Sequence, residues 1–355
     1  MGKWVKREII MSDISYKSAG VDIEAGNEAV ELIKSSVKST FSDNVLTGIG
    51  NFGSLYDLKP IIKNYKNPVM VQSIDGVGTK TIIARKMNKY DTIGIDLLSA
   101  ASNDIIVMGA KPLTFLDYIA NDKLDPKIIE VIVAGMAKAC RENKVSLVGG
   151  ETAEMPDVYL KGEHDLVGII TGIVEKEKII DGSKIIDGDI VIGLPSNGLH
   201  TNGYSFARKI LFDIGGLKVD DELPELEESV GLTLLAPHIN YTNHIFSIIN
   251  EKIEIKGIAH ITGGGLLENI PRILPVNTQV LIDRTSWPVP PIFTVMKNIG
   301  KVKSNEMFRS FNMGLGMVLV INPSNYDKIK TLLNPFSKAY QIGKVESGEN
   351  GVVIE

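Results

Sequence analysis

Cysteine is almost missing from this sequence of 355 residues, which contains a single one, Cys140. One thiol excludes an internal disulfide, and a chain without disulfides is typical of the cytoplasm, where we therefore expect this protein to reside. The stretch around Cys140, "IIEVIVAGMAKACRENK", has apolar residues at helical spacing, which predicts a buried, unreactive thiol rather than a nucleophile. The cysteine and the five histidines show no spacing that is typical of zinc sites.

Long apolar runs and an excess of positive charge are missing as well. No apolar run reaches the roughly 18 residues that a membrane-spanning helix requires, so no membrane partner is expected. The formal net charge of −5 and the pI of about 5.7 argue against a nucleic-acid partner, because proteins that grip phosphate backbones usually carry a basic face. The first residues lack the apolar core of a signal peptide, and we expect residues 1–14 to form a flexible N-terminal extension.

Common motifs of nucleotide binding and hydrolysis are absent around the glycines of "QSIDGVGTK" (72–80). Neither G-x-x-x-x-G-K-[ST] nor G-x-G-x-x-G can be placed on this stretch, so a P-loop and a dinucleotide-binding fold have no support there. The sequence also has no G-x-S-x-G elbow of the kind that carries a serine nucleophile.

The pattern of strands and helices that is present predicts a two-domain protein of the α/β (α+β) class. A charged stretch with two Asp-Gly turns, "EKEKIIDGSKIIDGD", marks the expected boundary, so that residues 15–175 form an N-terminal domain and residues 176–355 a C-terminal domain. Elements expected in the first domain are helices at 26–40 and 126–143, strands at 113–120 and 164–176, a buried strand at 68–74, a short strand and a long helix within 90–112, and a strand running into a glycine turn at 145–155.

The residue types of "QSIDGVGTK" suit a phosphate site. Gly76 and Gly78 let backbone amides approach an anion closely, and Lys80 adds a positive charge. Asp75 would repel a bare phosphate, so a divalent cation between the carboxylate and the phosphate is the natural resolution. A hairpin turn with a surface lysine is the alternative that this stretch alone leaves open.

Further carboxylates interrupt the apolar segments of the first half. They are Asp96, Asp104, Asp117, Glu151 and Glu154, together with the amide of Asn103. Polar groups in apolar segments need partners, and oxygen ligands gathered in one place are what Mg²⁺ bridging phosphates requires. We therefore expect these acids to converge on a magnesium and phosphate site, with separate caps on helices and turns as the alternative.

Two glycine-rich loops precede predicted helices in the second half, "SNGLHTNGY" (196–204) and "HITGGGLLENIP" (260–271). Backbone amides at a helix N-terminus can bind an anion, so either loop could hold a phosphorylated substrate. His200 lies inside the first loop, where a site role and a structural role are equally open. The remaining histidines are expected to be structural: His164, His238, His244 and His260.

Seven segments, read in order, resemble the phosphoribosylformylglycinamidine cyclo-ligases, the aminoimidazole ribonucleotide synthetases of purine biosynthesis. The segments are "SYKSAGVDIEAGNEAV", "DGVGTK", "TIGIDLLSAASNDIIVMGAKPLTFLDYIA", "LVGGETAEMPDVY", "GLHTNGYSFARKIL", "AHITGGGLLENIPRILP" and "FNMGLGMVL". Each motif alone is moderately specific, whereas the ordered set is highly specific. The likeness extends from about Ser15 to the C-terminus with little insertion.

The resemblance implies an enzyme that uses ATP to close the imidazole ring of formylglycinamidine ribonucleotide, giving 5-aminoimidazole ribonucleotide, ADP and phosphate. It also implies the fold shared with formylglycinamidine synthetase, selenophosphate synthetase and thiamine-phosphate kinase. In that fold the N-terminal sheets of two subunits pair into a barrel in a homodimer, and the C-terminal domain is an α/β sandwich. Mg²⁺ is the implied metal, and a requirement for K⁺ is left open.

Carried over position by position, the resemblance assigns residues to four roles. The ATP-binding residues are Lys17, Asp75, Gly76, Gly78, Thr79, Lys80, Asp96, Asn103, Asp104, Gly149, Gly150, Glu151 and Thr152. The substrate-binding residues are Ser196, Asn197, His200, Thr201, Asn202, Gly263, Gly264 and Gly265. The metal ligands are Asp75, Asp96 and Asp104. The catalytic residues are Lys80 and His200, with His200 as the candidate general base.

One position departs from the family pattern, because Pro237-His238 stands where the family often has Pro-Thr after "LLA". If that threonine touches the substrate, the contact is altered here. A selenophosphate synthetase is disfavoured, since Cys140 is misplaced for a reactive thiol near the N-terminus. A nucleotide-binding regulatory protein without turnover is the rival from another class, and the intact acids together with Lys80 argue against it.

Overall fold

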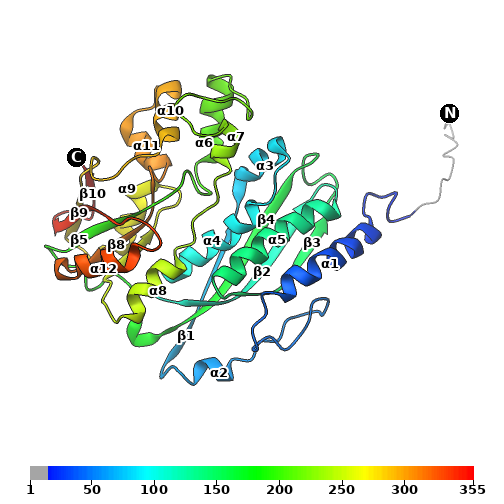
Figure 1. Ribbon diagram of the computed structural model, residues 1–355, viewed down its shortest axis with the longest axis horizontal. Coiled ribbons are helices and arrows are strands. Elements are labelled where there is room, and N and C mark those ends of the chain that lie inside the picture. The colour runs from blue at the N-terminus through cyan, green and yellow to red at the C-terminus, as the bar shows by residue number, and fades with distance from the viewer. Residues whose placement is uncertain (1–14) are drawn as a thin grey trace, which may run out of the picture.

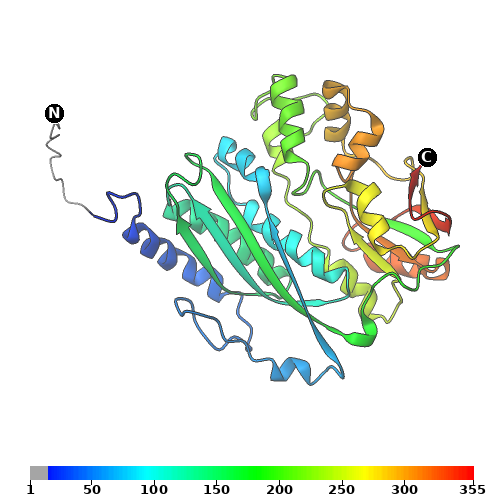
Figure 2. The ribbon, with the colours of Figure 1, turned by 180° about the vertical axis from the view of Figure 1, so that it is seen from behind.

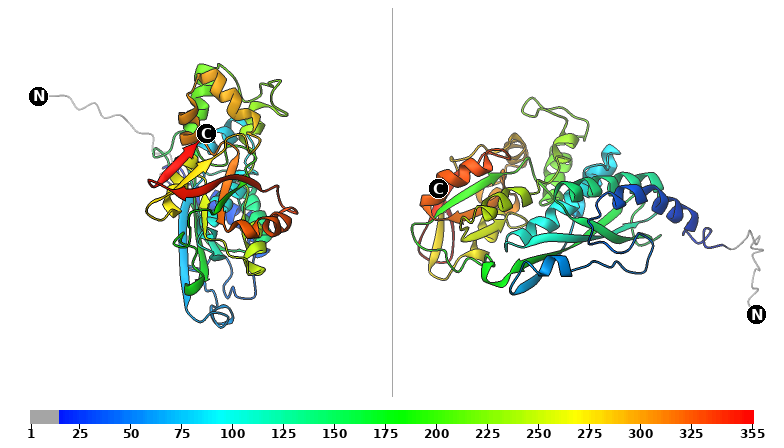
Figure 3. Two further views of the ribbon diagram at one scale, coloured as in Figure 1. Left: turned by 90° about the vertical axis from the view of Figure 1, so that its left-hand side faces the viewer. Right: turned by 60° about the horizontal axis from the view of Figure 1, so that its bottom comes forward.

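The computed structural model describes residues 15–355, and the flexible extension predicted for residues 1–14 lies outside them. The described chain folds around two β-sheets, one built from residues 68–175 and the other from residues 190–354. The sheets occupy different parts of an elongated molecule (Figure 1), and the first helix and the C-terminal strands lie at its opposite ends (Figure 3). Among the described residues, no helix combines the length and the apolar character needed to cross a membrane.

The first sheet has four strands in the order β1-β4-β2-β3. The strands are β1 (Pro68–Gly76), β2 (Lys111–Asn121), β3 (Ser146–Glu154) and β4 (His164–Glu175). β4 runs antiparallel to both β1 and β2, whereas β2 and β3 are parallel. The parallel pair requires a crossover connection, which is supplied by a helix that packs on the sheet.

Three helices cover one face of this sheet (Figure 1). They are α1 (Ile23–Lys38), α4 (Ile93–Ile106) and the crossover helix α5 (Pro126–Glu142). α1 and α5 begin where the carboxylates of Asp22 and Asp125 accept hydrogen bonds from amides of the first turn. α4 and α5 cross closely at Gly94, since a Cβ there would lie 2.0 Å from the carbonyl oxygen of Ile132.

The opposite face of the first sheet carries no helix of the described chain (Figure 2). Met70 and Ile74 of β1 are 66% and 65% exposed on this face. Ile169 of β4 and Leu116 of β2 continue the row, because the register aligns Ile74 with Ile169 and Ile169 with Leu116. We call these four residues the open apolar face, and a patch of this kind marks an interaction surface more often than a monomer's exterior.

The second sheet has six strands in the order β10-β7-β9-β5-β8-β6. The strands are β5 (Ile190–Pro195), β6 (Gly257–His260), β7 (Thr278–Ile282), β8 (Leu315–Ile321), β9 (Tyr340–Ser347) and β10 (Gly351–Ile354). All of β8 is buried, because apolar clusters fill both sides of the sheet. The longer helices of this half are α8 (Thr242–Asn250), α10 (Pro291–Gly300), α11 (Ser304–Ser310) and α12 (Tyr326–Leu333).

Short elements complete the chain and place the loops of the site. They are α2 (Lys59–Ile62), the 3-10 turn η1 (Gly78–Lys80), α3 (Thr81–Met87), η2 (Lys176–Lys178), α6 (Tyr204–Arg208), η3 (Lys209–Ile214), α7 (Val230–Leu234), α9 (Gly265–Asn269), η4 (Ile270–Ile273) and η5 (Pro323–Asn325). The turn η1 directly follows β1, while α6 and α9 follow the two glycine-rich loops of the second half.

The mixed α/β class is confirmed, but three local expectations were wrong. Residues 90–92 form no strand, because the chain enters α4 directly at Ile93. Gly149 and Gly150 form no turn, because both remain in β3, paired with Leu116 and Asp117 of β2. The strand at 68–74 is not buried on both faces, because Met70 and Ile74 are exposed as part of the open apolar face.

Candidate functional site

A fully buried ion pair joins the two halves of the chain. Lys80 of η1 and Asp96 of α4 approach to 2.8 Å between Nζ and Oδ2, and neither side chain is exposed. Lys80 Nζ also donates to the carbonyl oxygen of Ala236 at 2.7 Å, and Asp96 Oδ1 accepts the backbone N–H of His238 at 2.6 Å. The pair therefore fastens the first domain to residues 236–238 of the second half.

Burial opposes the charge on both members of this pair. It lowers the pKa of Lys80 and raises the pKa of Asp96, because each charge has lost its water, while the attraction between the two acts against both shifts. The turn that delivers Lys80 requires Gly78, whose φ of +63° lies in the left-handed region. Asp96 thus has Lys80 and His238 as its partners, whereas Asp104 contacts Ser73 and His260.

Asp75 and Asp104 form, with Ser73, a group that we call the acid cluster. Ser73 Oγ donates to Asp104 Oδ2 at 3.0 Å, and Asp75 Oδ1 accepts the N–H of Gly76 at 2.7 Å. Burial raises the pKa of Asp75; the Gly76 hydrogen bond lowers it in part, and the charge of Asp104 raises it further. The charge of Asp104 thus opposes ionisation of Asp75, so the acid cluster favours a cation.

A group of three histidines, which we call the histidine cluster, connects the acid cluster to the second half. His260, the last residue of β6, places Nδ1 2.9 Å from Asp104 Oδ1 and Nε2 3.2 Å from His238 Nε2. His238 Nδ1 lies 3.3 Å from Thr201 Oγ1, and its ring stacks on that of His200 with 4.0 Å between centroids. Polar contacts therefore run without a break from Asp104 to the loop at 196–204.

His200 has an unusual environment for a histidine. Its side chain is buried, its φ is +63°, and in the described structure neither ring nitrogen has a hydrogen-bond partner. Burial lowers the pKa of His200 well below its usual value, with smaller contributions from His260 and Lys80. A neutral imidazole with an available nitrogen is the form that a general base requires. Gly316 leaves room for this ring, because a Cβ there would lie 2.4 Å from His200 Cε1.

The two glycine-rich loops of the second half lie against each other and against η1. Asn202 Oδ1 accepts the N–H of Gly263 at 3.0 Å, which ties the first loop to the second. Thr79 Oγ1 lies 3.2 Å from Ser205 Oγ, which brings the turn after β1 to the same place. Ser196 is buried and bonded within its loop, whereas Asn197 is exposed.

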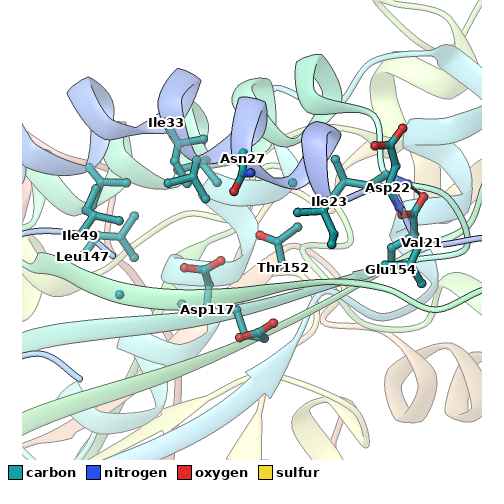
Figure 4. Close-up of a pocket in the computed structure, with 18 residues that line it drawn as sticks. Val21, Asp22, Ile23, Asn27, Ile33, Ile49, Asp117, Leu147, Thr152 and Glu154 are labelled. Carbon is teal, nitrogen blue, oxygen red and sulfur yellow. Dashed lines mark hydrogen bonds between the residues drawn. The ribbon is translucent and has the colours of Figure 1, made fainter. Parts of the chain in front are cut away.

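A separate cavity of about 380 Å³ lies between α1 and the first sheet (Figure 4). Residues 149–152 of β3 line it, and Asp117 of β2 lies on its floor, opposite the α1 residues Ile23 and Asn27. Burial raises the pKa of Asp117 to about 7. Lys17 pairs with Asp22 at the N-terminal end of α1, with 2.6 Å between Nζ and Oδ2.

The structure thus brings some predicted site residues together and separates others. Asp75 and Asp104 converge, as do the loops that contain Asn202 and Gly263. Residues 149–152 line the α1 cavity instead. Gly168 lies between Asp75 and Asp117 in the sheet, and Phe115 and Leu97 fill the space over it, which separates the α1 cavity from the acid cluster. Among the described residues, no group of three or more His, Cys, Asp or Glu is arranged to hold a metal ion.

Sequence reasoning missed three polar residues of this region. Ser73 and His260 both contact Asp104, and His238 contacts His260 and Thr201. The position of His260, at the start of the glycine-rich stretch "HITGGG", was a usable signal. The departure from the family pattern at Pro237-His238 was the signal for His238, whereas its partner Asn103 is 135 residues away along the chain and could not be identified from the local sequence.

Comparisons with known proteins identify the family of this chain. Residues 60–174 match the family model of the AIR synthase related protein, N-terminal domain, and residues 187–355 match that of the C-terminal domain. The phosphoribosylformylglycinamidine cyclo-ligase of Thermoanaerobacter pseudethanolicus is 48% identical over 342 residues, which are 96% of this chain and 100% of the relative. The chain belongs to the phosphoribosylformylglycinamidine cyclo-ligase family. The resemblance that the seven segments indicate is therefore confirmed.

Further relatives support the membership and the fold. The family member of Trichlorobacter lovleyi is 50% identical over 334 residues, covering 94% of this chain and 95% of the relative. The solved thiamine-monophosphate kinase of Stenotrophomonas maltophilia has a TM-score of 0.68 at 18% identity, covering 92% of this chain and 96% of that one. A hydrogenase maturation protein HypE solved in complex with ATP has a TM-score of 0.66 at 18% identity, covering 93% and 91%. These two structures share the fold with the family member described here.

Proposed function

We propose that this chain catalyses the ATP-dependent closure of the imidazole ring of formylglycinamidine ribonucleotide in purine biosynthesis, releasing 5-aminoimidazole ribonucleotide, ADP and phosphate. The observation that carries the proposal is the 48% identity to a phosphoribosylformylglycinamidine cyclo-ligase over that relative's full length. The convergence of the acid cluster, the turn η1 and the two glycine-rich loops supports it, because phosphoryl transfer needs the phosphates and the acceptor in one place.

The chemical difficulty of the reaction is the formamide oxygen, which is a poor leaving group. Transfer of the γ-phosphoryl group of ATP to that oxygen, with loss of the formamide N–H proton, makes an iminophosphate and releases ADP. The amidine nitrogen then attacks the same carbon, loses a proton, and phosphate departs. Because attack and departure occur within one held molecule, correct positioning can lower the barrier of the second step by several kcal/mol, at most roughly 7–11.

Residues of this chain are proposed for each task. The loops containing Asn202 and Gly263 hold the phosphorylated substrate, and His200 accepts the amidine proton in its neutral form. Lys17 and residues 149–152 contact the nucleotide along the α1 cavity. Lys80 holds η1 in place through its ion pair with Asp96. It therefore contributes to phosphoryl transfer indirectly, by positioning Gly78 and Thr79.

The acid cluster fits Mg²⁺ by the chemistry of its donors. Two carboxylates and a hydroxyl are hard oxygen ligands, and Mg²⁺ is commonly held by one or two carboxylates together with substrate phosphates and waters. Asp75 and Asp104 would hold the ion. When bound there, Mg²⁺ would neutralise charge on the phosphates during transfer. Asp96 would contribute indirectly, because it is occupied by Lys80.

We further propose that the chain forms a homodimer through the open apolar face. Met70, Ile74, Leu116 and Ile169 present a row of apolar side chains from three strands, and covering them would remove this surface from water. Pairing of two such sheets would give the barrel that the resemblance implies. The division at residue 176, the cytoplasmic location and the K⁺ requirement stay predictions from the sequence.

The test is a coupled assay with Mg²⁺, ATP and formylglycinamidine ribonucleotide, in which ADP and 5-aminoimidazole ribonucleotide are measured together. We expect one ADP for each ring closed, and no ADP without the ribonucleotide. ATP binding without turnover in the presence of the ribonucleotide would favour the nucleotide-binding regulatory protein instead.

A further inference from the structure

His238 occupies the centre of the contacts between the two halves. Its side chain is 2% exposed, its backbone N–H donates to Asp96, and its ring lies within hydrogen-bond distance of Asn103, Thr201 and His260. We propose that His238 is a positioning residue for ring closure, which holds Thr201 of the glycine-rich loop at 196–204 in a fixed position relative to the acid cluster. This inference rests on the proposed function.

The neighbours of His238 determine where its proton lies. Asn103 Oδ1 accepts the backbone N–H of Tyr241 at 2.9 Å, so Asn103 Nδ2 is the atom that faces His238 Nε2 at 3.1 Å. An amide nitrogen can only donate, so His238 Nε2 accepts. A neutral imidazole then carries its hydrogen on Nδ1, where Thr201 Oγ1 lies 3.3 Å away. We therefore assign His238 as the donor to Thr201.

The other contacts keep the ring of His238 in one orientation. The ring of His200 stacks on it with an interplanar angle of 21°. His260 Nε2 lies 3.2 Å from the same Nε2 of His238 and is therefore the donor of that contact, while a proton between His260 Nδ1 and Asp104 Oδ1 holds His260 in turn. Because the ring is restrained from several directions, it has little freedom to move, so it holds Thr201 at a fixed position relative to the acid cluster.

The position of Thr201 matters for the substrate. It directly precedes Asn202, whose side chain ties the two glycine-rich loops together through Gly263. Because both ring nitrogens of His238 are engaged, whereas those of His200 have no partner in the described structure, His238 acts on the substrate through Thr201 rather than by touching it. Small displacements of groups that orient a substrate are enough to slow a reaction strongly.

Two substitutions separate the hydrogen bond from the bulk of the ring. His238→Asn places an amide nitrogen near the position of Nδ1 and so keeps a donor for Thr201, whereas His238→Gln places its amide near Nε2 and leaves Thr201 without that donor. We expect His238→Gln to raise KM for formylglycinamidine ribonucleotide by up to about tenfold, the effect of losing one hydrogen bond. KM for ATP should stay unchanged, and His238→Asn should keep the KM of the wild type for both substrates.

Two further variants complete the experiment. Thr201→Val should match His238→Gln, and the double variant should be no worse than either single one, since both remove the same contact. His244→Gln is the control, because His244 is also buried but packs against Tyr241 and Phe336. It should keep the KM of the wild type for the ribonucleotide.

Specific outcomes would overturn the role of His238. Equal losses in the Asn and Gln variants would show that ring volume matters rather than the bond to Thr201. An equal rise of both KM values in His238→Gln would show a merely structural role, and unchanged kinetics would show none. If the wild type itself closes no ring, the proposed function fails together with this inference, whereas an active wild type with an unaffected His238→Gln variant removes only the inference.

Discussion

Replacing Asp96 by asparagine should destabilise this protein strongly, because Lys80 would be left as a charge without a counterion. Both side chains are fully buried, and besides Asp96 the described neighbours of Lys80 Nζ are uncharged: the carbonyl oxygen of Ala236 and the ring of Tyr204, whose centroid is 5.8 Å away. Removing one partner of a buried ion pair costs about 3–5 kcal/mol. At about 2–4 °C per kcal/mol for a domain of this size, the melting midpoint should fall by about 6–20 °C.

The assay is thermal unfolding followed by circular dichroism, with matched variants. Lys80→Met combined with Asp96→Asn should melt above the Asp96→Asn variant, because the double variant no longer buries an unpaired charge. Glu254→Gln is the control, since Glu254 forms an exposed pair with Lys184, and such pairs contribute little to stability. An Asp96→Asn variant that melts with the wild type would refute the description of this pair as the link between the halves.

Three other predictions concern separate parts of the molecule. Burial raises the pKa of Asp117 from 3.8 to about 7. The contribution of the protonated carboxyl to stability is therefore present below pH 3.8 and is lost as pH rises through 7. Asp117→Asn cannot ionise, so in urea unfolding it should gain stability over the wild type between pH 4 and pH 8. Ile74→Lys should convert a dimer to monomers in sedimentation velocity, because it places a charge on the open apolar face, and an unchanged sedimentation coefficient would contradict this. Gly316→Ala should lower the melting midpoint, since its Cβ would lie 2.1 Å from Tyr241 Oη, whereas Gly26→Ala, with nothing within 4 Å, should raise it in the same measurement.

The sequence was sufficient for much of the fold because local signals and tertiary packing agree there. The helix predicted at 126–143 is found at Pro126–Glu142, because proline is favoured at the first position of a helix. Gly149 and Gly150 show the opposite case, since two glycines indicate a turn and yet remain in β3. Their strand pairing with β2 decides the conformation, and that pairing is not visible in the local sequence.

The candidate site was predictable in its residue types and only partly in its geometry. Carboxylates in apolar segments correctly indicated polar partners, but a pattern along the chain does not say which partner each acid takes. Asp104 meets Ser73 and His260, whereas Asp96, two helical turns earlier, meets Lys80. The difference arises from which segments pack against each turn of α4, and that packing is set by the tertiary structure.

The measurement that tests the central claim most directly is ATP binding by calorimetry at increasing Mg²⁺ concentration, for the wild type, Asp75→Asn and Asp104→Asn. The claim is that Asp75 and Asp104 together hold the ion that binds the phosphates. We expect ATP affinity to rise with Mg²⁺ in the wild type, and this dependence to disappear in both variants. Asp91→Asn, which removes an exposed acid paired with Lys89, should behave as the wild type. The same Mg²⁺ dependence in all four proteins would contradict the claim.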